Sequence, residues 1–153
     1  MRRLYALFFV SGFPALLYQV VWQRALFSIY GVNVESVTIV VTAFMLGLGL
    51  GSLLGGWLSA RPGLRRLVTF GVMELGIGAF GLVSLAAFAA VGAGTAGAGT
   101  LGAGLYAFLL VLLPTVLMGA TLPLLTAYLV ERSGNVGRSV GMLYFVNTLG
   151  SAV

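Results

Sequence analysis

The chain has 153 residues, of which 60% are hydrophobic and 7% charged, and its net charge is +5. Soluble domains carry roughly 25% charged residues, so the composition excludes an ordinary water-soluble protein. Cysteine, histidine and aspartate are absent, and the three carboxylates, Glu35, Glu74 and Glu131, lie far apart in the sequence. Catalytic triads, paired-carboxylate mechanisms and metal sites therefore lack their residues, and we expect no metal and no cofactor in this chain.

Long apolar runs divide the chain. Four of them cover residues 4–30, 36–60, 67–91 and 101–130. Each exceeds the roughly 20 residues that cross a bilayer core. A fifth run, 139–153, is too short to cross unless the natural chain continues. The sequence therefore predicts an all-α membrane protein with four complete transmembrane helices and a truncated fifth, without a soluble catalytic domain and with further helices expected beyond it.

Arginine marks alternate ends of these runs. The arginines outside the runs are Arg2, Arg3, Arg61, Arg65, Arg66, Arg132 and Arg138. The connections 31–35 and 92–100 contain none. By the positive-inside rule the N-terminus and the arginine-bearing connections face the cytoplasm, with Arg61, Arg65 and Arg66 as interface anchors. We expect an integral protein of a bacterial cytoplasmic membrane, and this distribution explains the charge without a nucleic-acid partner.

The first run contains two glutamines among apolar residues. Gln19 and Gln23 are four residues apart, so they share one helix face. Amides within a bilayer must face protein or a cavity. Gln19 and Gln23 are therefore candidates for a substrate path, and hydrogen bonding between helices is their simpler use.

The same run contains a charge and several aromatic side chains. Arg24 is about 10 Å from the end of the run at 1.5 Å per residue, so its guanidinium can reach the outer interface. It is predicted to be an anchor. Trp22, Tyr5 and Tyr30 are predicted to lie in the aromatic belts at the membrane interfaces.

The second run contains GLGLGSLLGG. Gly47, Gly51 and Gly55 are spaced by four and share one helix face. Without side chains there, a neighbouring helix can approach closely and gain van der Waals contact. We expect this face to pack against another helix, and the alternative is a flexible or kinked segment.

The connection Gly56–Arg66, GWLSARPGLRR, resembles a pattern of the major facilitator superfamily. The residues that fit are Gly56, Leu58, Arg61, Gly63, Arg65 and Arg66. Ala60 stands where that pattern has aspartate, so the interaction of that charge is missing. A short turn at Pro62 and Gly63, with arginines that serve topology alone, is an equally open interpretation.

The remaining runs contain polar groups and prolines at membrane depth. Glu74 is an ionisable group within the third run and is a candidate to bind a cation, a proton or an arginine. Pro114 and Pro123 remove backbone donors from the fourth run, so we expect kinks and freed carbonyls that need partners. Asn147 in the fifth run is a further candidate for a substrate path.

An ordered set of motifs resembles one known family. The stretches are residues 11–26, 43–61, 73–82, 117–130 and 136–153. They are similar to the N-terminal multi-span domain of membrane-fused spermidine synthase-like proteins, which itself resembles part of a major facilitator bundle. The resemblance implies polyamine biosynthesis by aminopropyl transfer, and a soluble synthase domain that follows in the chain or binds as a separate partner.

This chain departs from the family in one plain way. Gln19 stands where the family usually has glutamate, so a charge is lost there. The aspartates that hold the amine in soluble spermidine synthases have no counterpart, because the chain has no aspartate. The chain is therefore expected to anchor or support the transferase reaction without catalysing it, and no catalytic residue is assigned.

Two alternatives remain open. The chain can be a fragment of a major facilitator-type transporter for a small solute, with a cation as one candidate. It can also be a scaffold that binds other membrane proteins through its glycine faces.

Overall fold

A computed structural model describes residues 2–30, 33–95 and 99–152. Its helices are α1 (Arg2–Tyr30), α2 (Asn33–Ser59), α3 (Arg66–Gly94), α4 (Gly99–Ser133) and α5 (Val136–Ser151). Within the described ranges all regular structure is helical, which confirms the all-α prediction. The first four helices are long and apolar enough to cross a membrane, so this is an integral membrane protein. The predicted outer connections, 31–35 and 92–100, fall partly outside the described residues.

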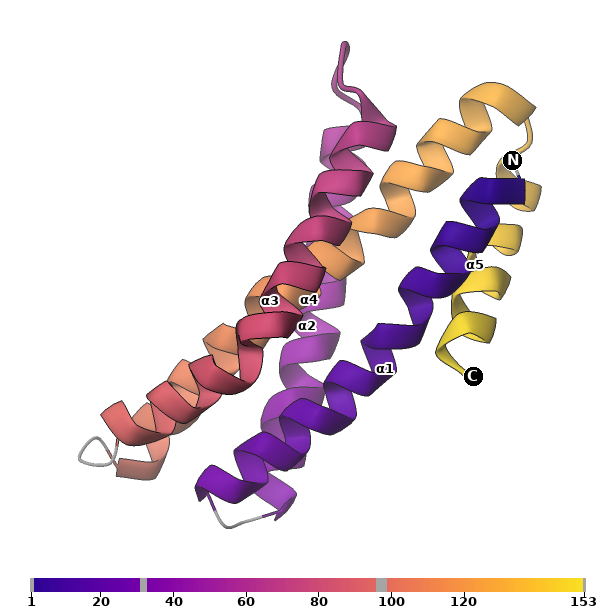
Figure 1. The fold of residues 1–153 in the computed structure, drawn as a ribbon. Helices are drawn as coiled ribbons and strands as arrows, with labels where there is room; N and C mark the ends of the chain where they lie inside the picture. Colours follow the sequence, from indigo (N-terminus) through magenta and orange to yellow (C-terminus); the bar gives the residue numbers. More distant parts are fainter. Residues whose placement is uncertain (1, 31–32, 96–98, 153) are drawn as a thin grey trace.

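The fifth helix begins three residues before the predicted run. Gly134 adopts φ +66°, a left-handed conformation that ends α4 without a Cβ penalty. The Asn135 side chain then accepts a hydrogen bond from the Arg138 backbone N–H at 2.9 Å, which caps α5. The tight turn therefore folds α5 back along α1, beside the N-terminal half of that helix (Figure 1).

The glycine face of α2 packs against α4. A Cβ at Gly51 would meet the Val116 carbonyl oxygen and lie 2.8 Å from Gly119 Cα, and a Cβ at Gly55 would meet the Ala120 backbone. Gly47 lies against the Thr115 side chain. Glycine is required at this interface because the neighbours are mostly backbone atoms, which cannot move aside as a flexible side chain can.

Helix α4 contacts all four other helices and runs through both of its prolines. Pro123 cannot donate to the Gly119 carbonyl, and the Ser52 hydroxyl of α2 lies 3.5 Å from that oxygen. The Thr115 hydroxyl has one proton to donate and lies 2.8 and 3.0 Å from carbonyls of its own helix and 3.3 Å from the Ala43 carbonyl of α2. Hydroxyls at the α2–α4 interface thus supply partners to carbonyls within the bilayer.

The structure corrects the prediction for Trp22. Its side chain is 0% exposed and lies in the core, not in an interfacial belt. The indole stacks on Tyr18 with ring centroids 5.0 Å apart and contacts Phe44, Phe80 and Phe88. Trp22 is therefore on the face of α1 that packs against α2, which carries Phe44, and α3, which carries Phe80 and Phe88. Tyr5 is half-buried, and the side chain of Tyr30 is outside the described part.

Apolar side chains also cover the outside of the bundle. Leu53, Leu75 and Leu82 are 73%, 76% and 90% exposed. Large apolar patches of this kind are rare on soluble proteins and suit contact with lipid chains. This bundle is therefore surrounded by the lipid bilayer.

Candidate functional site

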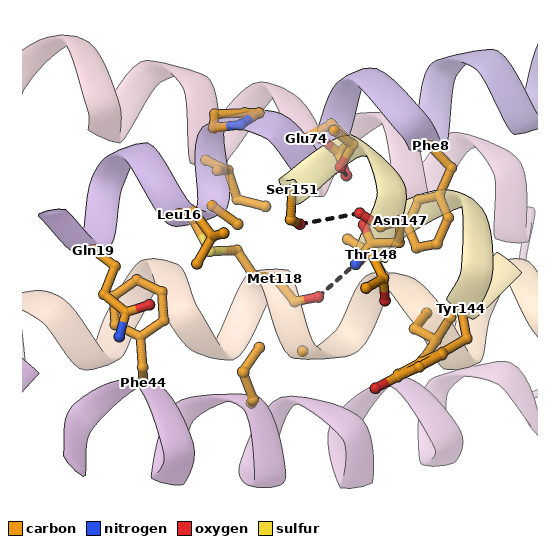
Figure 2. Close-up of a pocket in the computed structure, with 18 of the residues that line it drawn as sticks. Phe8, Leu16, Gln19, Phe44, Glu74, Met118, Tyr144, Asn147, Thr148 and Ser151 are labelled. Atoms are coloured by element: carbon orange, nitrogen blue, oxygen red, sulfur yellow. Dashed lines mark hydrogen bonds between the residues drawn. The ribbon is translucent and has the colours of Figure 1, made fainter. Parts of the chain in front are cut away.

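A cavity of about 380 Å³, open to the outside of the bundle on one side, lies between the helices and has walls from all five. Three of the four predicted substrate-path residues line it: Gln19, Glu74 and Asn147. They come from α1, α3 and α5, and Figure 2 shows them around one space. The other polar side chains of its wall are Ser11, Ser52, Thr121, Tyr144, Thr148 and Ser151. The structure thus gathers polar groups that are scattered along the sequence.

Glu74 is the carboxylate of this cavity. It lies eight residues after the start of α3, about 12 Å along the helix axis. The Ser11 hydroxyl of α1 donates a hydrogen bond of 2.7 Å to Glu74 Oε1. Within the described residues no arginine is within ion-pair distance of Glu74, so of its three candidate partners the arginine does not pair with it, and a neutral hydroxyl lies there instead. A hydroxyl carries no charge, so the ionised carboxylate would have no cationic partner among the described residues, and a cation that entered the cavity could pair with it.

The α1 wall follows from helix periodicity. Ser11, Ala15 and Gln19 are spaced by four, so they form one row along α1 that faces the cavity. Ser11 holds Glu74 at one end of this row, and Gln19 lies about 12 Å further along the axis. Apolar residues between them, such as Leu16, Phe44 and Met118, complete the wall. The cavity therefore has a carboxylate at one end, an amide about 12 Å away, and apolar side chains between them.

The α5 wall is held against α1 by small residues. A Cβ at Gly12 would meet the Asn147 carbonyl oxygen, and a Cβ at Gly150 would meet that of Phe9. The Ser151 hydroxyl bridges the two helices, with the Gly12 carbonyl and the Asn147 carbonyl each 3.0 Å away. The Asn147 side chain points toward Met118 of α4 (Figure 2). Close contact with α1 thus positions Asn147 at the cavity.

Gln23 and Arg24 lie away from this cavity. Gln23 is half-buried and is not part of the cavity wall. Within the ranges that the structure describes, neither Gln19 nor Gln23 makes a side-chain hydrogen bond to a neighbouring helix, so that use of the pair stays a prediction. Arg24 is exposed, as an interfacial anchor would be. One amide of the predicted pair therefore belongs to the site.

Ser11 and Ser151 are functional candidates that sequence reasoning missed. A serine in a transmembrane helix is unremarkable by itself, since its hydroxyl can bond to its own helix. Their spacing to Gln19 and to Asn147, eight and four residues, is the available signal. The partner of Ser11 is 63 residues away and could not be found from periodicity.

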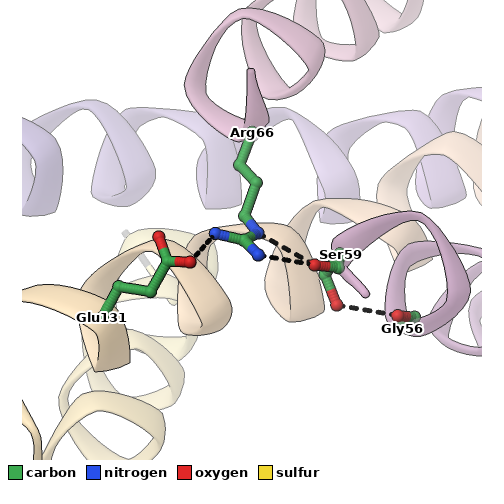
Figure 3. A network of polar contacts seen from close by, with 4 residues as sticks. All are labelled: Gly56, Ser59, Arg66 and Glu131. Atoms are coloured by element: carbon green, nitrogen blue, oxygen red, sulfur yellow. Dashed lines mark hydrogen bonds and ion pairs between the residues drawn. The ribbon is translucent and has the colours of Figure 1, made fainter. Parts of the chain in front are cut away.

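A second polar network lies where α2, α3 and α4 meet. Arg66 donates to the Ser59 carbonyl through Nε at 3.0 Å and Nη2 at 2.8 Å, and its Nη1 pairs with Glu131 (Figure 3). Arg66 thereby provides donors at the C-terminal end of α2, where carbonyls lack helical partners. Arg61 lies 3.6 Å over the Trp57 ring, and Arg65 is exposed. Among these arginines Arg66 links three helices.

Comparison of the chain with family models, curated proteins and solved structures found no match.

Proposed function

We propose that this chain is the N-terminal membrane module of a spermidine synthase-like protein and that its cavity binds a small cationic amine. The observation that carries the amine is Glu74, a carboxylate in an intramembrane cavity with a neutral hydroxyl as its partner. The ordered sequence motifs support the family. The proposal includes a bacterial cytoplasmic membrane with the N-terminus in the cytoplasm, on the basis of the arginine distribution.

The cavity has the properties that a small amine needs. Its volume of about 380 Å³ is within the range of small-molecule sites. An ammonium beside Glu74 would form a charge-assisted hydrogen bond with the carboxylate. The carbon chain would lie against Leu16 and Met118, and the Gln19 amide could bond to a polar group at the far end. One carboxylate in the wall favours one buried ammonium.

The aminopropyl transfer itself would take place elsewhere. The chain has no aspartate or histidine for deprotonation of an amine. A soluble synthase domain, in the same natural chain or as a separate subunit, would supply those groups. The membrane module would anchor that domain and hold amine close to it.

Binding of amines to the purified chain tests the site. We expect n-butylamine and putrescine to bind in detergent micelles, and n-butanol, which lacks the ammonium, to bind far more weakly. Glu74→Gln keeps an acceptor for Ser11 and removes the charge, so amine affinity should fall about 10- to 100-fold. Glu131→Gln, on the exposed carboxylate outside the cavity, is the matched control. Equal affinity of the wild type and Glu74→Gln would refute the amine site.

A separate assay tests the family. The product of the complete natural gene should transfer an aminopropyl group from decarboxylated S-adenosylmethionine to an amine. If it does not, with several amines tried, the synthase assignment fails while the amine site stands or falls on its own binding data.

The cavity also keeps the transporter alternative in view. A carboxylate at membrane depth is typical of ion and solute paths. Reconstituted vesicles distinguish the two functions: amine uptake that Glu74→Gln abolishes would favour transport, and binding without uptake would favour the anchoring module.

A further inference from the structure

A second cavity of about 380 Å³ lies between α1, α3 and α4 and shares no residue with the central cavity. It is at the end of the bundle where α1 begins, α3 begins and α4 ends (Figure 1). Its wall consists of Arg3, Leu4, Leu7, Leu67, Phe70, Gly71, Tyr128, Leu129 and Arg132. These residues are called the arginine groove below.

Two positive charges from separate helices lie at the arginine groove. Arg3 and Arg132 are both exposed, and the Arg132 guanidinium is 4.5 Å from the centre of the Tyr128 ring. Within residues 2–30, 33–95 and 99–152 the ion pair that forms is Arg66 with Glu131, so neither groove arginine is neutralised there. The groove therefore presents a net positive charge without a counter-ion from the described chain.

The rest of the groove is apolar and open toward the lipid side. Leu7 and Leu67 are 59% and 41% exposed, whereas Phe70 and Leu129 are 5% and 1% exposed and form its floor. A Cβ at Gly71 would meet no atom within 4 Å, so the groove has free space beside α3. Leu7 is about 6 Å deeper along α1 than Arg3. Charge at the membrane interface thus continues into an apolar track that runs toward the bilayer core.

We propose that the arginine groove binds one anionic phospholipid, whose phosphate headgroup pairs with Arg3 and Arg132 while an acyl chain lies along Leu7, Leu67 and Gly71. Basic pockets between transmembrane helices on the cytoplasmic side have the charge that acidic headgroups need. A free phosphate would use the arginines and leave the apolar track empty. The track therefore favours a lipid over a soluble anion. This inference does not depend on the amine proposal, because the two cavities are separate.

Titration of the purified, delipidated chain with single lipids tests the groove. Native mass spectrometry in a neutral detergent gives dissociation constants for phosphatidylglycerol and for phosphatidylcholine with the same acyl chains. We expect phosphatidylglycerol to bind more tightly. The double variant Arg3→Gln/Arg132→Gln should weaken phosphatidylglycerol binding about 30-fold. Each arginine near the surface contributes about 1 kcal/mol to the attraction of an anionic lipid, and the loss of two such contributions corresponds to that factor.

Two further variants separate the parts of the groove. Arg138→Gln removes an exposed charge outside the groove and should leave the phosphatidylglycerol affinity unchanged. Gly71→Leu keeps every charge and fills the apolar track, so it should weaken phosphatidylglycerol binding while the thermal unfolding temperature stays as in the wild type.

Several results would overturn the inference. They are equal binding of the two lipids, an unchanged affinity in the double variant, an equal loss in Arg138→Gln, or unchanged binding in Gly71→Leu. Displacement of phosphatidylglycerol by millimolar inorganic phosphate would show a soluble-anion site and would overturn it as well.

Discussion

The α2–α4 interface and the α1–α5 interface both use glycine, and they differ in how far the close contact extends along the helices. Along α2, Gly51 and Gly55 bring two backbones together over consecutive turns. Between α1 and α5, Gly12 and Gly150 do the same, and the cavity begins beside them, at Ser11 and Asn147. Both interfaces border the cavity, since Ser52 and Gly119 line it from α2 and α4, and the difference is one of extent: close contact runs along much of α2, whereas α5 has 16 residues and meets α1 closely at Gly12 and Gly150.

The largest effect is expected at the continuous interface. Gly51→Ile would place side-chain atoms where the Val116 carbonyl and Gly119 lie, and backbone atoms cannot move aside. We expect a loss of about 3 kcal/mol in the free energy of unfolding, measured by denaturant titration in detergent micelles. Gly49→Ile is the control, because a Cβ at Gly49 meets nothing within 4 Å. Equal stability of the two variants would contradict the assigned interface.

A smaller effect is expected where α5 meets α1. In Gly150→Ala the added methyl would meet the Phe9 carbonyl, so α5 must shift away from α1. We expect a loss of about 2 kcal/mol together with weaker amine binding, because the shift moves Asn147. Gly141→Ala, with open space at its Cβ, should change neither quantity. Loss of stability without any change in amine affinity would show that this interface does not position the cavity wall.

The network of Arg66, which joins the end of α2 to α4, should contribute less to the free energy of unfolding than the glycines of α2. Arg66→Gln removes the donors to the Ser59 carbonyl and the pair with Glu131, which is 58% exposed. An exposed ion pair contributes little, so we expect a loss of about 1 kcal/mol, mostly from the hydrogen bonds. Arg65→Gln should leave the unfolding temperature unchanged. A larger loss in Arg65→Gln than in Arg66→Gln would contradict the network.

The smallest effect is expected at the hydroxyl between α5 and α1. Ser151→Ala removes the contacts of 3.0 Å to the Gly12 and Asn147 carbonyls. We expect a loss of about 0.5–1 kcal/mol, as for one ordinary hydrogen bond. The check is the unfolding free energy of this variant beside that of Ser28→Ala, whose hydroxyl donates within its own helix. A loss as large as that of Gly150→Ala would show that the hydroxyl, rather than the close approach, holds α5.

Prediction of the helices from the sequence worked well because its signals are local. The structure confirms four membrane-length helices, and α2 ends at Ser59, one residue before the predicted end. The start predicted for α5 is three residues late, because the apolar run begins further along the chain than the capping residue Asn135. The belt prediction for Trp22 was wrong because an aromatic residue suits an interface and a core equally well by composition.

The sequence was sufficient to predict the membrane and the helices, since length and hydropathy along the chain decide whether a segment can cross a bilayer. It also singled out Gln19, Glu74 and Asn147, because polar groups are costly within apolar runs. The packing of the helices places these three around one cavity, brings Ser11 to Glu74, and leaves Gln23 outside the cavity wall and Trp22 in the core. The reason is geometric: helix periodicity defines faces within one helix, and the packing of helices decides which faces meet.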